Sequence, residues 1–191
     1  MKVLGISGSL RRDSHNTKLL RAAADLFGDD VEFEIWEGLK AVPPYDEDDD
    51  VAEAPAAVAE LRAAVAGADA VLFATPEYNA SIPGQLKNAL DWVSRPLAVN
   101  PLRNKPVAVV GASTGAFGAV WSQAELRKVL AAIGARVLEC EVACRHAAAS
   151  FDEHGRLIED EVRAQLAEAV GRLVDAVGDR REARLTASVA A

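Results

Sequence analysis

Residues 8–17 combine serine and threonine hydroxyls, an asparagine amide and two arginine side chains directly after a short apolar run. These groups donate hydrogen bonds to anions, and a helix that begins in this segment adds free N–H groups and a partial positive charge. The segment lacks the glycine spacing of a dinucleotide fingerprint and the Gly-Lys-Ser/Thr ending of a P-loop. We therefore expect a cradle for the single phosphate of a mononucleotide. The alternative is an ordinary helix start, capped by Ser14 or Asn16.

Two further loops carry polar or glycine-rich sequence. Residues 75–84 contain Pro76 and Pro83, which stiffen the chain, so its backbone groups could lie along the edge of a heteroaromatic ring. Tyr78 could pack against that ring or against a partner, and a turn before a proline-started helix is the alternative. Residues 111–118 contain three glycines, which allow a ligand to approach the backbone closely.

The elements that must position these loops alternate along the chain. Apolar or alternating segments predict five strands, at residues 2–7, 31–36, 70–74, 106–111 and 136–142. Apolar residues at helical spacing predict a helix after each strand, at residues 19–27, 58–65, 86–93, 126–133 and 162–177. Such alternation indicates an α/β fold with a doubly wound parallel sheet and helices on both faces. Ligands of these sheets bind at the carboxyl ends of the strands, where the three loops lie.

The composition fits one domain with a full core, since half of the 191 residues are hydrophobic. The net charge of −8 disfavours nucleic acid and anionic membranes as partners. We expect no secretory leader and no apolar run long enough to span a bilayer, so the expected location is cytoplasmic. The domain is expected to cover residues 1–178, and residues 179–191 to form a disordered tail because helical periodicity is lost there.

The cysteines, histidines and acidic residues of the chain give little further indication of function. Cys140 and Cys144 are expected to be reduced thiols, and no metal site is expected. The three histidines have no evident partner, so no acid–base catalyst is assigned. Residues 46–50 are all acidic and are expected to form a solvated loop. Glu77 is equally compatible with a loop-stabilising hydrogen bond and with a catalytic role.

Taken together, these loops resemble the NADPH-dependent FMN reductases, bacterial enzymes that include quinone, chromate and azo-dye reductases with a flavodoxin-like fold. The specific part of the resemblance is the Pro-Glu-Tyr-Asn run at 76–79, joined to the Lys-Asn-Ala-Leu-Asp-Trp helix at 87–92. The runs at 8–11, 111–115 and 151–157 are weaker singly but occur in the same order. The resemblance covers about residues 1 to 175.

The resemblance implies a five-stranded flavodoxin-like sheet of order 2-1-3-4-5 and FMN as the cofactor. It also implies roles for the matching positions. Ser9, Arg11, Ser14 and Asn16 would hold the FMN phosphate, Pro76, Glu77, Tyr78 and Asn79 would line the isoalloxazine and ribityl chain, and Ser113 and Gly115 would contact the other side of the flavin.

The implied activity is a ping-pong reaction, in which NADPH or NADH reduces flavin N5 and a small acceptor then takes the electrons. The acceptor could be a quinone, a flavin, an azo dye or a metal oxyanion. Members of the family form homodimers and often homotetramers. The chain departs from the family pattern at Ala80, where a polar residue is common, and at His15, where an aromatic residue is common.

Three alternatives to a reductase stay open at this stage. The first is an electron carrier of the flavodoxin type. The second is a flavin-binding redox sensor that uses Cys140 and Cys144. The third is an α/β domain that binds another phosphate ligand. The choice between NADH and NADPH is also open, with Arg12, Arg95 and Arg103 as candidate partners for a 2′-phosphate.

Overall fold

The computed structural model describes residues 1–51 and 54–189. Within them, one parallel sheet has the order β2-β1-β3-β4-β5, with a further short strand, β6, paired with β4. The strands are β1 (Lys2–Ser7), β2 (Glu32–Trp36), β3 (Ala70–Thr75), β4 (Pro106–Ala112), β5 (Arg136–Val137) and β6 (Ala143–Cys144). The predicted fold class and strand order are confirmed.

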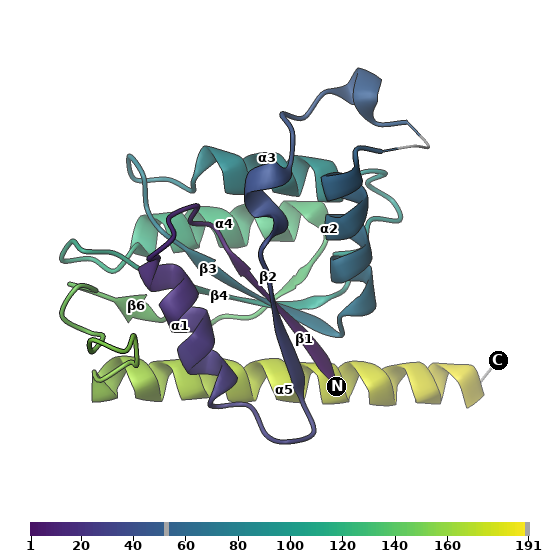
Figure 1. The fold of residues 1–191 in the computed structure, drawn as a ribbon. Coiled ribbons are helices and arrows are strands. Elements are labelled where there is room, and N and C mark those ends of the chain that lie inside the picture. The colour runs from purple at the N-terminus through teal and green to yellow at the C-terminus, as the bar shows by residue number, and fades with distance from the viewer. Residues whose placement is uncertain (52–53, 190–191) are drawn as a thin grey trace.

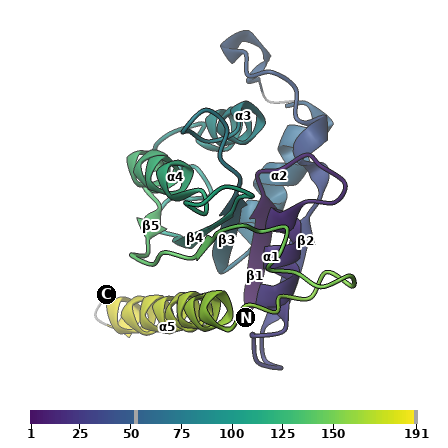
Figure 2. The ribbon, with the colours of Figure 1, turned by 90° about the vertical axis from the view of Figure 1, so that its left-hand side faces the viewer.

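Helices cover both faces of the sheet (Figures 1 and 2). They are α1 (His15–Ala24), α2 (Ala56–Gly67), α3 (Gly84–Val93), α4 (Val120–Ile133) and α5 (Asp160–Val189), with the 3₁₀ turns η1 (Gly38–Ala41) and η2 (Glu47–Asp49) after β2. The helices α1 and α5 pack on one face, and α2, α3 and α4 pack on the other.

The central strands explain why their sequences are apolar throughout. In β3, Val71 and Phe73 belong to the core beneath α2, α3 and α4, whereas Leu72 and Ala74 belong to the core beneath α1 and α5. Successive side chains of a strand point to opposite faces, so a strand covered on both faces is apolar at every position. The predictions of central strands at residues 70–74 and 106–111 are confirmed by β3 and β4.

The prediction of a single fifth strand at 136–142 is wrong. This edge segment pairs with β4 at Val137 and again at Ala143, opposite Val107 and Gly111. It therefore has two more residues than β4 between these pairs, and residues 138–142 leave the ladder. An edge strand tolerates such an interruption because only one neighbour depends on it.

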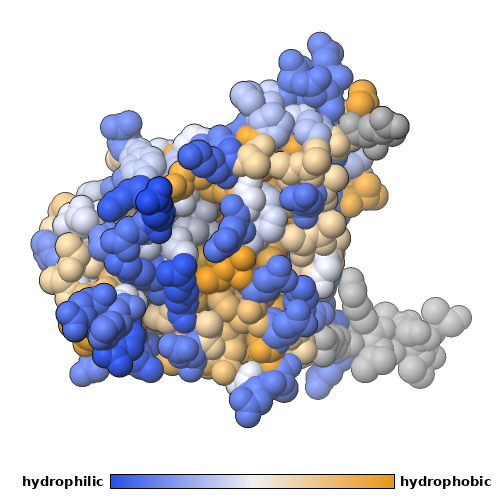
Figure 3. Space-filling model, in the orientation of Figure 1, coloured by the Kyte–Doolittle hydropathy of each residue, from blue (hydrophilic) through white to orange (hydrophobic). Residues whose placement is uncertain are grey.

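Two peripheral segments, residues 46–50 and the end of α5, were expected to form a solvated loop and a disordered tail. The acidic segment 46–50 projects beyond the domain at the top right of Figures 1 and 3, and hydrophilic side chains gather there. Asp50 at its end forms an ion pair of 2.9 Å with Arg62 of α2. Helix α5 continues to Val189, past the start of the predicted disordered tail at residue 179, and fraying of this end in solution stays a prediction. None of the described helices is both long and apolar enough to cross a membrane.

Candidate functional site

The loops after β1, β3 and β4 meet at the carboxyl edge of the sheet around a cavity of about 120 Å³. Eleven residues line the cavity. They are Ser9, Arg11, Ser14, His15, Asn16, Pro76, Glu77, Tyr78, Ala112, Ser113 and Thr114. Eight of these were predicted site residues, while Asn79 and Gly115 lie in the same loops without lining the cavity. The strand order reverses between β1 and β3, and in doubly wound sheets the ligand crevice lies at this switch point.

Two serine side chains stabilise the first loop by hydrogen bonds to its backbone. Ser14 is the N-cap of α1, and its Oγ accepts a hydrogen bond of 3.2 Å from the Thr17 N–H. The Ser9 Oγ accepts one of 3.4 Å from the Arg11 N–H. The predicted capping of this helix by Ser14 is therefore confirmed. The first N–H groups of α1, at His15 and Asn16, have no intrahelical acceptors, and both residues line the cavity.

Two hydrogen-bonded contacts at the start of α1 were not predicted from the sequence. The Asn16 side chain donates to the Ala112 carbonyl and accepts from the Ala112 N–H, both at 3.0 Å. It thus ties the start of α1 to the end of β4, and its predicted contact with phosphate stays a prediction. The Thr17 Oγ1 donates to the Ser7 Oγ at 3.1 Å, which fixes the first turn of α1 against β1. Sequence spacing held no signal for either contact.

The second loop is held by Glu77. Its Oε2 accepts hydrogen bonds from the N–H groups of Trp121 and Ser122, at 3.1 and 3.2 Å. These groups lie in the first turn of α4, whose own N-cap, Ala119, has no capping side chain. A carboxylate is favourable at a helix N-terminus. Of the two roles considered for Glu77, the structure shows the loop-stabilising hydrogen bond.

Beyond Glu77 the loop closes in a tight turn. Tyr78 and Ser81 exchange backbone hydrogen bonds of 3.1 Å across Asn79 and Ala80. Both central residues have positive φ, 54° and 59°, which is the left-handed region. This turn presents Tyr78 to solvent, with 48% of its surface exposed, beside the cavity.

The third loop crosses over β6. Gly118 has a φ of 61°, and a Cβ there would lie 2.6 Å from the backbone of Ala143, so only glycine fits. The Ser113 Oγ accepts from the Gly115 N–H at 3.1 Å. Phe117 packs against Trp121 with ring centres 4.8 Å apart, and both residues are about half exposed.

His15 is the histidine at this site. Its ring stacks on Phe151 with centroids 5.9 Å apart, and its buried Nδ1 has no hydrogen-bond partner among the described residues. Partial burial, followed by the charges of Lys18 and Arg11, lowers the pKa of His15 below its ordinary value. The neutral form of the ring is therefore favoured over a wider pH range than in a free histidine.

Neither cysteine lines the cavity, although the Cys144 carbonyl accepts a hydrogen bond of 3.0 Å from the Ser113 N–H. Both thiols are free, with Cys144 buried and Cys140 half-buried, and burial raises the pKa of each. A raised pKa lowers the fraction of reactive thiolate. Over the described part of the chain, no group of three or more histidine, cysteine and acidic side chains could hold a metal ion.

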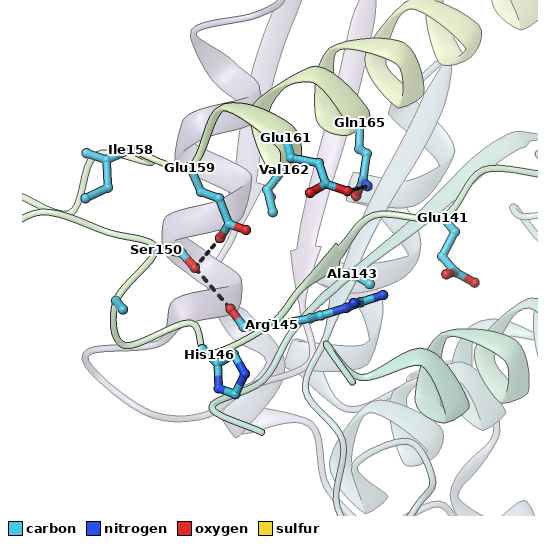
Figure 4. Close-up of a pocket in the computed structure, with 11 residues that line it drawn as sticks. Glu141, Ala143, Arg145, His146, Ser150, Ile158, Glu159, Glu161, Val162 and Gln165 are labelled. Carbon is cyan, nitrogen blue, oxygen red and sulfur yellow. Dashed lines mark hydrogen bonds between the residues drawn. The ribbon is translucent and has the colours of Figure 1, made fainter. Parts of the chain in front are cut away.

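A separate hollow of about 470 Å³ lies between residues 141–150 and the start of α5 (Figure 4). Arg145 extends along it, and Glu141, Glu159 and Glu161 also line it. The Glu159 carboxylate accepts a hydrogen bond of 2.6 Å from the Ser150 Oγ. Three carboxylates around one arginine disfavour a phosphate, so this hollow suits an anion less well than the cavity between the three loops does.

The residues around that cavity fit FMN. Arg11, the free N–H groups at the start of α1 and the hydroxyls of Ser9 and Ser14 suit a phosphate. Residues 76–78, which lead into the turn closed between Tyr78 and Ser81, and the Ser113 loop both line the cavity beside these groups. No acid–base pair is needed here, because the cofactor itself carries the electron-transfer chemistry.

Known proteins resemble this chain along most of its length. The family model for NADPH-dependent FMN reductases matches residues 1–149. An NAD(P)H-dependent FMN reductase of Pseudomonas aeruginosa is 43% identical over 164 residues, which cover 85% of this chain and 88% of that protein. A 2-hydroxy-1,4-benzoquinone reductase of a Burkholderia species is 36% identical over 95% of this chain and 98% of its own length.

A solved structure agrees with these sequence matches. The flavoenzyme NAD(P)H:(acceptor) oxidoreductase FerB from Paracoccus denitrificans superposes with a TM-score of 0.81 and 34% identity. The match covers 93% of this chain and 97% of FerB.

Proposed function

Because the chain belongs to the NADPH-dependent FMN reductase family, and is thus an FMN-dependent oxidoreductase that uses NAD(P)H, we propose that it reduces a small soluble acceptor in a ping-pong reaction. The observation that carries the proposal is the convergence of three loops, from β1, β3 and β4, on one cavity. Quinones are the first acceptors to test, because a relative is named as a benzoquinone reductase. Flavins, azo dyes and metal oxyanions complete the panel.

In this proposal the bound FMN supplies hydride and electron transfer. Arg11 and the first turn of α1 bind its phosphate, and Asn16 holds that turn in place through Ala112. Glu77 fixes the 76–81 loop against α4, so that its backbone lines the ring edge. Nicotinamide and acceptor occupy the same open side in turn, which is the basis of a ping-pong scheme.

We also propose a homodimer that covers a group of exposed aromatic side chains. Tyr78, Phe117 and Trp121 are each about half exposed, with Tyr78 and Phe117 in loops and Trp121 in the first turn of α4. Clustered exposed aromatic residues are typical of interfaces. A cytoplasmic location stays part of the proposal, and the two unpaired cysteines are consistent with a reducing compartment.

The alternative of a cysteine-based redox sensor receives less support. Both thiols have raised pKa values, and Cys144 is fully buried in the core beneath α5. A sensor cysteine needs an exposed, acidic thiol. An electron carrier of the flavodoxin type would have the same fold. Only a measurement of catalytic turnover distinguishes it from an enzyme.

The experiment that tests the proposal is anaerobic stopped-flow reduction of the FMN-loaded protein by NADH and by NADPH, followed by mixing with each acceptor. Complete bleaching of the flavin by one nicotinamide, then rapid reoxidation by a quinone, is expected. Flavin that is reduced only when a separate reductase is added would identify a carrier. Protein that takes up no FMN at all would overturn the proposal.

A further inference from the structure

A second hollow lies on the other side of the first loop. It has a volume of about 250 Å³ and is enclosed by residues 7–12, by the Thr17 and Arg21 side of α1, and by residues 35–40. Ser9 and Arg11 line both this hollow and the cavity between the three loops. The two spaces therefore adjoin each other, with the first loop as their common wall.

Basic side chains dominate this hollow. Arg12, Arg21 and Lys40 line it together with Arg11, against a single carboxylate, that of Glu37. Within the described chain, the side chains of Arg12, Arg21 and Lys40 make no hydrogen bond or ion pair, and all three are exposed. Elsewhere in this acidic protein, basic residues such as Lys2, Lys18 and Arg62 are paired with carboxylates. An unpaired basic group of this kind attracts anions.

The floor of the hollow is apolar and fixed. Trp36 lines it, and the Trp36 ring approaches Gly38 so closely that a Cβ there would lie 2.4 Å from the indole. Leu39 is buried beneath, and the Gln85 side chain donates to the backbone carbonyls of Leu39 and Val42 at 2.9 and 2.8 Å. A flat base could therefore pack on Trp36 while its phosphate meets the surrounding cations.

We propose that this hollow binds the adenosine 2′-phosphate of NADPH and makes the protein prefer NADPH to NADH. The inference rests on the proposed function, because it gives the electron donor a second anchor beside the flavin phosphate. Of the three arginines considered from sequence, only Arg12 lines this hollow. Arg95 instead lies over the Tyr45 ring, 5.9 Å from its centroid, and hydrogen bonding to Tyr45 raises the pKa of Arg95.

Binding is tested on FMN-loaded protein without any turnover. Adenosine 2′,5′-bisphosphate carries the 2′-phosphate half of NADPH, and 5′-AMP carries the corresponding half of NADH. By calorimetry at low salt, the bisphosphate is expected to bind about tenfold tighter or more, as one charge-assisted contact allows. Trp36 fluorescence should change on binding, and the Trp36→Phe variant should lose this change.

Charge variants locate the site. Arg21→Ala combined with Lys40→Ala is expected to weaken the bisphosphate by about tenfold or more and to raise the KM for NADPH, with the KM for NADH unchanged. Glu37→Gln should strengthen bisphosphate binding, because it removes the one carboxylate from the hollow. Lys128→Ala is the matched control, since it removes an exposed charge from α4, away from the hollow.

Several outcomes overturn the inference. They are equal affinity for the bisphosphate and 5′-AMP, unchanged bisphosphate binding in the double variant, and competition by inorganic phosphate at the same concentration as the bisphosphate. The FMN content and unfolding midpoint of each variant show whether it is folded. Failure of the proposed function gives a different result, because nucleotide binding would then persist in a protein that does not oxidise NADPH.

Discussion

The Asn16 side chain and the Ala112 backbone exchange two hydrogen bonds of 3.0 Å, both buried. They join the second residue of α1 to the last residue of β4, which lie 96 positions apart in the chain. The first and third loops of the cavity are thereby held at a fixed separation. This pairing takes up one donor and the acceptor of the asparagine amide, and leaves one N–H for a ligand.

Replacement of Asn16 by alanine is expected to lower the free energy of unfolding of the cofactor-free protein by about 2–4 kcal/mol, because two buried backbone groups lose their partners. Denaturant unfolding measures this change. Asn16→Asp keeps an acceptor for the Ala112 N–H, so it should recover part of the stability but bind FMN more weakly through charge repulsion. An Asn16→Ala protein of unchanged stability would contradict the role of this pairing.

Removal of the Glu77 carboxylate is expected to destabilise the start of α4. Glu77→Ala should lower the free energy of unfolding by about 0.5–2 kcal/mol, the range for loss of a helix cap. Glu77→Gln keeps a side-chain oxygen and should lie close to the unmodified protein in stability. Thermal or denaturant unfolding without FMN distinguishes the two variants. If Glu77→Gln instead abolished flavin reduction while stability stayed unchanged, a catalytic role would return.

Sequence patterns predicted the central part of this fold because burial on both faces makes β3 and β4 apolar throughout. The same reasoning failed at the edge. The stretch 136–142 is also rich in apolar residues, but its pairing with β4 depends on two extra residues that no periodicity shows. The positions of the three functional loops followed from the central strands alone, and that is why most predicted site residues line one cavity.

The individual roles within the site were harder to predict, because they depend on contacts between distant segments. Glu77 acts on N–H groups more than forty residues away, and Asn16 acts on a strand end in the other half of the domain. The turn at Asn79 and Ala80 has no glycine, so the positive φ of Ala80 could not be expected from its residue type.

His15→Phe is expected to stabilise the cofactor-free protein by about 1 kcal/mol, because it removes a buried nitrogen that has no hydrogen-bond partner among the described residues and keeps the stack on Phe151. The lowered pKa of His15 also predicts a pH dependence. Its stabilising contribution is complete above the ordinary value of 6.5 and is lost as the pH falls through the folded-state pKa. The advantage of His15→Phe should therefore grow from pH 7.5 to pH 5, and parallel stability profiles would contradict it.

Ala80→Gly is expected to raise the free energy of unfolding by about 0.5–1 kcal/mol. An alanine with left-handed backbone is strained by about 1–2 kcal/mol, and part of the gain is offset by the greater freedom of glycine in the unfolded chain. Asn79→Gly is the matched comparison, and its gain should be smaller because asparagine tolerates this conformation. Chemical unfolding of both variants measures the difference, and a loss of stability in Ala80→Gly would count against the strained turn.

Arg11→Ala is expected to weaken FMN binding by about 1.5–3 kcal/mol, the scale of a hydrogen bond to a charged group. Quenching of flavin fluorescence on titration of the cofactor-free protein measures this loss. Arg12→Ala is the neighbouring control, since Arg12 lines only the hollow on the other side of the loop. Equal losses in both variants would indicate a general charge effect. Unchanged affinity in Arg11→Ala would leave the N–H groups of α1 and the serine hydroxyls as the main phosphate ligands, because no lysine and no second arginine lines that cavity within the described residues.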